Sequence, residues 1–174
     1  MKPAIPICML GAGRVGRLHT GNLARYLPGG QVVALVDPLE EARQALAREW
    51  GIEACFASLE QALEEVDFEA VIITTPTPTH RSLAVLAAAH GKHVFLEKPM
   101  ALDLQECDAI LEAVDRAGVI LQMGFMRRFD PEFVAAARRI EAGEIGQPMM
   151  IKSRTHGPGL PPPWARDLKT SNGM

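Results

Sequence analysis

The sequence has few cysteines, few aromatic residues and no long apolar run. Its 174 residues include 3 cysteines, and aromatic side chains make up 5% of the chain. An odd number of widely spaced cysteines in apolar surroundings argues against a disulfide framework or a metal cluster and indicates a reducing compartment, the cytoplasm. No apolar stretch approaches the roughly 20 residues that a membrane-spanning helix needs. We therefore expect no membrane partner and no metal site.

The chain also has no large excess of charge of either sign. Lysine and arginine number 18 against 21 acidic residues, which gives a net charge of −3 and a pI near 6.0. Without a basic surplus, nucleic acid is not an expected partner. Hydrophobic residues make up 48% of the chain, enough to bury a core in one domain or in one domain plus part of a second.

The first 37 residues contain the pattern around which the rest is organised. An apolar segment at residues 5–10 reads as a strand, a helical pattern follows at 15–26, and a second apolar strand at 32–36 ends at Asp37. Between the first strand and the helix stands a glycine-rich motif, Gly11-Ala12-Gly13-Arg14-Val15-Gly16. This strand, turn, helix and strand is the context in which such a motif indicates dinucleotide binding.

Each glycine of the motif has a separate expected role. Gly11 permits a sharp turn, Gly13 lets a pyrophosphate approach the backbone, and Gly16 lets the helix pack closely. The N–H groups at the helix N-terminus would then bind the phosphates. Asp37, about 20 residues beyond the last glycine, can accept hydrogen bonds from both ribose hydroxyls and would repel a 2′-phosphate. The predicted cofactor is NAD, and the alternative is an ordinary turn with a solvated Asp37.

Helical and apolar segments alternate as far as residue 124. Helical spacing predicts helices at 39–50, from Ser58 with Gln61 as a capping box, at 80–90 with Thr79 as N-cap, and at 104–117. Apolar runs predict strands at 53–56, 70–74, 93–96 and 119–122. The expected fold class is α/β, a Rossmann-type doubly wound parallel sheet.

The pattern changes after Gly124. A helical pattern at 131–142 is followed by a break and by alternation at 149–154, typical of a half-buried strand. We predict an NAD-binding domain at 1–124 and the beginning of a second, α+β substrate and oligomerisation domain at 125–174. Because one strand cannot form a stable sheet, we also expect the chain to be incomplete at its C-terminus.

Parallel sheets bind ligands at the carboxyl ends of their strands. The candidate site residues are therefore those that follow each predicted strand. They fall in the glycine turn, at Asp37, and in the segments 74–80, 97–99 and 123–128.

Four motifs resemble, in their order along the chain, the signature of the glucose–fructose oxidoreductase, inositol dehydrogenase and MocA family: Gly11 to Gly16, Thr75-Pro76-Thr77-Pro78-Thr79-His80, Glu97-Lys98-Pro99 and Gly124-Phe125-Met126-Arg127-Arg128-Phe129-Asp130-Pro131. Residues 126–130 and 164–174 look most like inositol 2-dehydrogenases. The resemblance implies hydride transfer from a secondary hydroxyl of a cyclic polyol or sugar to NAD, in a dimeric or tetrameric homo-oligomer.

The resemblance also implies roles for particular residues. Lys98, after the fifth strand, would be catalytic and would hydrogen-bond the substrate hydroxyl, with a cis peptide before Pro99. Thr75 and Pro76 look like the wall on the adenosine side, while Thr77 and His80 would reach the phosphates or the nicotinamide ribose. A turn with a helix cap explains that segment equally well.

Three further side chains are candidates. Glu97 would fix Lys98 or the nicotinamide ribose, or be a surface acid. Arg127 and His156 would bind substrate, although Arg127 could instead form an inter-domain ion pair. Arg128 is interpreted as surface charge, and His19, His90 and His93 as helix or strand-end residues.

The chain departs from the family pattern at its end. Family members place an Asp and a general-base His shortly after a segment like 171–174, where this chain ends. We therefore expect the chain to bind NAD but to lack the base. Two alternatives stay open, a non-catalytic dinucleotide-binding module such as a sensor and an S-adenosylmethionine-dependent methyltransferase, although Glu97-Lys98-Pro99 argues against the second.

Overall fold

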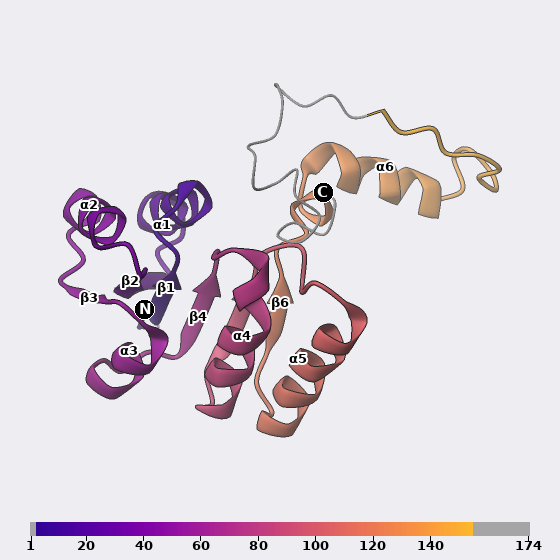
Figure 1. Ribbon diagram of the computed structural model, residues 1–174. Coiled ribbons are helices and arrows are strands. Elements are labelled where there is room, and N and C mark those ends of the chain that lie inside the picture. The colour runs from indigo at the N-terminus through magenta and orange to yellow at the C-terminus, as the bar shows by residue number, and fades with distance from the viewer. Residues whose placement is uncertain (1–2, 155–174) are drawn as a thin grey trace.

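A parallel sheet with helices on both faces forms the body of the molecule. The structure, a computed structural model, describes residues 3–154 (Figure 1). The strands are β1 (Ile5–Leu10), β2 (Gly30–Val36), β3 (Ala54–Phe56), β4 (Ala70–Ile73), β5 (His93–Leu96) and β6 (Leu121–Met123). The helices are α1 (Arg14–Tyr26), α2 (Glu40–Trp50), α3 (Leu59–Glu65), α4 (His80–Ala89), α5 (Leu104–Ala117) and α6 (Pro131–Glu141), with short 3-10 turns η1 (Thr77–Thr79) and η2 (Met126–Arg128).

The strand order is β3-β2-β1-β4-β5-β6, and every pair is parallel. From β1 the chain first winds outward to β2 and β3, then returns to place β4 on the other side of β1. The order therefore reverses between β1 and β4, where a doubly wound sheet binds its ligand. The predicted fold class is confirmed.

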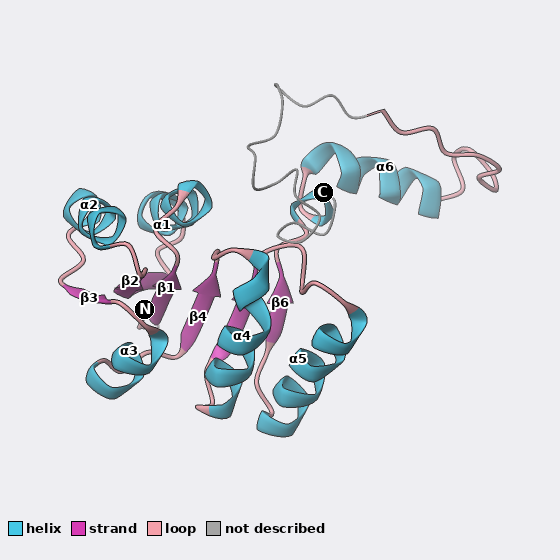
Figure 2. Cartoon of the chain, in the orientation of Figure 1, coloured by secondary structure: helices cyan, strands magenta, loops and turns pink. Residues whose placement is uncertain are grey.

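Successive side chains of each central strand pack on opposite faces of the sheet. In β1, Cys8 and Leu10 lie in a core cluster with residues of α3, α4 and α5, whereas Ile7 and Met9 lie in a second cluster with residues of α1 and α2. Figure 2 shows α4 and α5 side by side in front of the β4 and β6 part of the sheet. Both faces are covered, which is why these strands read as apolar throughout.

In two helices, some of the apolar residues with helical spacing are exposed. Leu18 and Tyr26 of α1 are 56% and 71% exposed, and small residues face the sheet instead. The cause is the close approach of α1: a Cβ on Gly16 would lie 1.9 Å from the Gly11 carbonyl oxygen. In α5, Leu104 and Leu111 are exposed, whereas Ile110 and Val114 are buried.

Both predicted side-chain caps differ from the structure. Ser58 is the N-cap residue of α3 but its side chain caps nothing, and Gln61 Oε1 instead accepts a hydrogen bond from the Ala57 N–H at 3.1 Å. Thr79 Oγ1 lies 2.7 Å from Thr75 Oγ1 and does not cap α4. The turn η1 precedes α4 directly, so the helix continues from an earlier turn and needs no new cap.

The segment after β6 departs most from the expected pattern. Residues 149–154 form no strand, and Met149 and Ile151 are 92% and 82% exposed. Nothing within residues 3–154 pairs with this segment, and a strand needs a partner for its backbone. The predicted helix is confirmed as α6, which lies beyond the carboxyl end of the sheet (Figure 1). Strand β6 begins two residues later than predicted because its partner is Val94–Leu96.

Candidate functional site

The glycine turn lies at the carboxyl end of β1 and leads directly into α1. Gly11 has a φ of +102°, which favours glycine, and Gly13 is the N-cap residue of α1. No side chain caps this helix, its first turn contains no acid, and a Cβ on Gly13 would meet nothing within 4 Å. Open space in front of an uncapped helix N-terminus fits a pyrophosphate, so the residues present suit a dinucleotide.

Asp37 is held against this turn at the end of β2. Its Oδ2 accepts a hydrogen bond from the Ala12 N–H at 2.7 Å, and its Oδ1 accepts one from the Leu39 N–H at 2.8 Å. Each carboxylate oxygen has a second lone pair, so the group can still accept from ribose hydroxyls. Asp37 therefore both orders the turn and offers the acceptors that a ribose needs.

A base lies beside Asp37 that the sequence interpretation missed. Arg43 Nη1 donates to the Asp37 carbonyl oxygen at 2.5 Å. The residues directly after Asp37, 38–41, contain no base. One turn further along α2, however, the helix brings Arg43 back to the end of β2.

The segment after β4 contains two buried members of the predicted site. Thr77 is 6% exposed and His80 is 1% exposed. His80 Nε2 lies 2.9 Å from the Thr75 carbonyl oxygen, and Nδ1 lies 2.9 Å from that of Pro99. Both ring nitrogens thus lie beside carbonyl oxygens of the protein, and contact of Thr77 or His80 with the cofactor stays a prediction. Thr75 is half-buried and Pro76 exposed at the same edge.

Glu97, Lys98 and Pro99 follow β5 at the same edge of the sheet. The peptide bond between Lys98 and Pro99 is cis, as predicted. Glu97 Oε2 accepts a hydrogen bond from the Lys98 N–H at 3.1 Å, so the carboxylate supports the backbone that carries the lysine. Lys98 itself is exposed. Glu97 thus contacts the backbone of Lys98, and its contact with the nicotinamide ribose stays a prediction.

Glu97 has a second partner, which sequence reasoning missed. His19 Nε2 lies 2.9 Å from Glu97 Oε1, with side chains 23% and 20% exposed, and its ring packs edge-on against Phe95. This hydrogen bond, together with the Lys98 N–H, holds the pKa of Glu97 below its usual value against the opposing effect of burial. The signal was available: His19 lies three positions after Gly16, on the face of α1 that packs inward.

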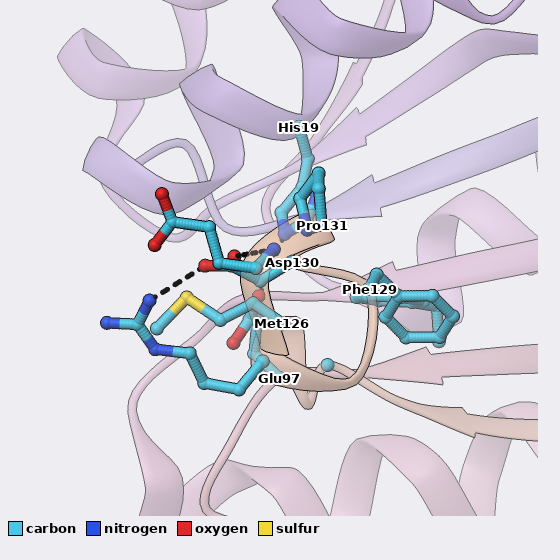
Figure 3. A pocket seen from close by; sticks show the side chains of 10 residues that line it. His19, Glu97, Met126, Phe129, Asp130 and Pro131 are labelled. Atoms are coloured by element: carbon cyan, nitrogen blue, oxygen red, sulfur yellow. Dashed lines mark hydrogen bonds and ion pairs between the residues drawn. The ribbon is translucent and has the colours of Figure 1, made fainter. Parts of the chain in front are cut away.

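The His19 and Glu97 pair lines a cavity of about 720 Å³ (Figure 3). Gly124 also lines the cavity. A side chain does not fit there, because a Cβ would lie 2.9 Å from Glu97 Cδ. The opposite wall comes from the segment after β6, which contributes Met126, Arg127, Phe129 and Asp130. The cavity therefore joins the edge of the sheet to the beginning of the predicted second domain.

Arg127 forms an ion pair with Asp130 at 2.9 Å and lies over the Phe133 ring at 5.0 Å. Both residues belong to the segment after residue 124, so this ion pair does not join the two predicted domains. Substrate binding by Arg127 stays a prediction. Arg128 lies over Phe125. His156 falls outside the described residues.

The cysteines are free thiols. Burial raises the pKa of Cys8 to about 12, and it also raises the pKa values of Cys55 and Cys107. Among residues 3–154 no helix is long and apolar enough to cross a membrane, and no three His, Cys, Asp or Glu residues are grouped to hold a metal ion.

An uncapped glycine turn and an ordered acid after β2, at the switch point of a parallel sheet, define a dinucleotide-binding Rossmann protein. A family model described as "Oxidoreductase family, NAD-binding Rossmann fold" matches residues 5–125, and the chain belongs to that family, the Gfo/Idh/MocA proteins. The family resemblance and the predicted cofactor NAD are thereby confirmed. The methyltransferase alternative is wrong.

Several named dehydrogenases are similar to this chain in sequence or in structure. The chain is 44% identical to scyllo-inositol 2-dehydrogenase (NAD(+)) of Bacillus subtilis over 100% of this chain and 50% of that protein. It is 33% identical to myo-inositol 2-dehydrogenase of Thermotoga maritima over 90% of this chain and 46% of that protein. The structure of scyllo-inositol dehydrogenase from Lactobacillus casei with NAD(H) and scyllo-inositol matches with a TM-score of 0.79 at 30% identity, covering 82% of this chain and 42% of that one. The chain thus spans about half the length of these relatives.

Proposed function

We propose that the full-length protein is an NAD-dependent oxidoreductase that oxidises a secondary hydroxyl of a cyclic polyol or sugar, with inositols as the favoured substrate class. One observation carries this proposal. The glycine turn and Asp37, which suit a dinucleotide, share a sheet edge with Glu97 and Lys98, beside the 720 Å³ cavity. The relatives named as inositol dehydrogenases support it.

The cofactor contacts are proposed for three parts of the chain. The turn from Gly11 to Gly16 binds the pyrophosphate through backbone N–H groups, and Asp37 accepts from the adenosine ribose. Thr75 and Pro76 flank the adenosine side, and Glu97 lies toward the nicotinamide ribose. NAD, when bound, supplies the acceptor for the hydride that leaves the substrate carbon.

Lys98 is proposed as the catalytic residue that this chain contributes. An ammonium group that hydrogen-bonds the substrate hydroxyl favours its alkoxide character as the proton leaves, and fixes the carbon for transfer. The Glu97 carboxylate accepts a hydrogen bond from the Lys98 N–H and a second one from His19, so it orders the backbone that carries the lysine. Arg127 and His156 are proposed to bind substrate. The proton is expected to pass to an Asp and His pair beyond residue 174.

The remaining proposals concern the whole protein. The chain from residue 125 begins the substrate and oligomerisation domain, whose sheet builds a dimer or tetramer. The protein acts in the cytoplasm, where the free thiols of Cys8, Cys55 and Cys107 stay reduced.

The test is reduction of NAD by the full-length protein, followed at the absorbance band of reduced nicotinamide. With scyllo-inositol, myo-inositol and a set of aldoses, we expect turnover with at least one inositol. If no substrate reduces NAD while NAD still binds, the non-catalytic module replaces the enzyme as the function.

A further inference from the structure

We propose that His80 is a positioning residue that holds together the two loops flanking the cofactor, without touching the cofactor itself. The inference rests on the proposed function, because it concerns how that site is kept in shape. It assigns His80 a task different from the contact that the sequence resemblance implies.

The position of His80 suits this task. It is the first residue of α4, it is 1% exposed, and its imidazole lies between the loop after β4 and the loop after β5. Nε2 lies 2.9 Å from the carbonyl oxygen of Thr75, and Nδ1 lies 2.9 Å from that of Pro99. Thr75 belongs to the proposed adenosine side, whereas Pro99 follows the proposed catalytic Lys98.

The backbone ladder does not extend this far. The hydrogen bond from the Glu97 N–H to the Ile73 carbonyl oxygen, at 3.0 Å, joins the ends of β4 and β5. Beyond it the two chains separate into loops, and the imidazole continues the link between them. A side chain that connects both loops fixes the distance from the proposed adenosine wall to Lys98.

The chemistry of the ring makes the link hard to replace. Both partners are carbonyl oxygens, which only accept, so a neutral ring donates to one of them at a time and a doubly protonated ring to both. The ring is planar and rigid, with nitrogens on opposite sides. Removal of the ring would take away the donor to at least one of these partly buried carbonyl oxygens, and an unsatisfied polar group costs more than the hydrogen bond itself contributes.

The test compares His80→Leu and His80→Gln with the wild type in the full-length protein, and uses His90→Leu as the matched control. His90 is the C-cap residue of the same helix, is exposed, and its Nδ1 lies 2.9 Å from the Leu86 carbonyl oxygen within that helix. Calorimetry gives the Kd for NAD, and initial rates at saturating NAD give kcat. Melting without ligand reports folding separately.

For His80→Leu we expect the Kd for NAD to rise about tenfold and kcat to fall about tenfold, because a small misplacement of reacting groups is costly. His80→Gln, which keeps an amide donor, should recover part of both losses, and His90→Leu should match the wild type. If His80→Leu does not fold, a change of about threefold or more in the kcat of His80→Gln supports the role.

Wild-type Kd and kcat in the variant that folds, even with a lower melting temperature, would overturn the inference and leave His80 merely structural. That result leaves the proposed function standing. If the wild-type protein binds no NAD, the proposed function fails, and this inference fails with it.

Discussion

Lys98 is the residue on which the proposed chemistry depends. We expect Lys98→Met to lower kcat about 100-fold, because an interaction made with the developing alkoxide is lost, and to change the Kd for NAD by less than about threefold. Steady-state rates and calorimetry measure the two effects. Lys92→Met is the matched control. Lys92 lies at the opposite end of β5 from Lys98, and its ammonium group lies 5.0 Å from the centre of the Phe68 ring. A similar loss in both variants would contradict the role.

Asp37 sets the choice between NAD and NADP. In Asp37→Ser the repulsion of a 2′-phosphate disappears while Arg43 stays beside the site. We expect the Kd for NAD to rise about tenfold and the Kd for NADP to fall, since a phosphate beside a guanidinium gains a charge-assisted hydrogen bond. Competition binding with both coenzymes measures this. NADP affinity equal to that of the wild type would show that another residue makes the choice.

The His19 and Glu97 pair gives the site a dependence on pH. The hydrogen bond from His19 lowers the pKa of Glu97 in the folded state. The ionised carboxylate therefore stabilises the fold fully at pH values above the pKa of an unfolded glutamate, and this stabilisation is lost as the pH falls through the lowered pKa. We expect His19→Leu to cost about 1 kcal/mol of unfolding free energy at neutral pH. Denaturation series at falling pH should show the difference shrinking below about pH 4, where the unfolded glutamate is protonated. A constant difference would mean that packing on Phe95 matters instead.

The first turn of α1 is the element whose position decides whether a dinucleotide fits. In Gly16→Ala the new Cβ would lie 1.9 Å from the Gly11 carbonyl oxygen, so the helix must move away from the turn. We expect a loss of about 2 kcal/mol in stability and at least about tenfold in NAD affinity. Melting and calorimetry measure them. Gly29→Ala, where a Cβ meets nothing within 4 Å, is the control and should behave as the wild type.

The elements of the sheet follow from sequence because both faces of each strand are buried, and a continuous apolar run such as Ala70–Ile73 has few other interpretations. The buried faces of helices are harder to predict. Leu18 has the right spacing, but close approach at Gly16 demands small residues there. The alternation at 149–154 misled for another reason, because a strand depends on a partner that local sequence cannot supply.

The site shows the same division. The glycine turn and Asp37 can be placed from sequence because their contacts are local to one strand, turn and helix. His19 meets Glu97 across 78 positions of sequence, and His80 meets Pro99 across 19, so neither contact follows from spacing alone. Such contacts form only once the fold brings the loops after neighbouring strands together.

At the scale of the whole molecule, the cavity lies where the parallel sheet ends and the segment after β6 begins. One wall of that cavity, from Met126 to Asp130, already belongs to the segment predicted to open the second domain. The division at residue 124 stays a prediction. The chain spans about half the length of the relatives it matches, so closure of the cavity and the source of the base stay part of the proposal for the full-length protein.

The central claim is that the backbone of the glycine turn binds the diphosphate of NAD while Asp37 excludes the 2′-phosphate. Calorimetric titration of the full-length protein with NAD and then NADP tests it most directly. The account predicts that NAD binds and that NADP binds at least about tenfold more weakly, since a carboxylate beside a phosphate costs about 1.4 kcal/mol or more. No binding of either coenzyme, or tighter binding of NADP, would contradict it.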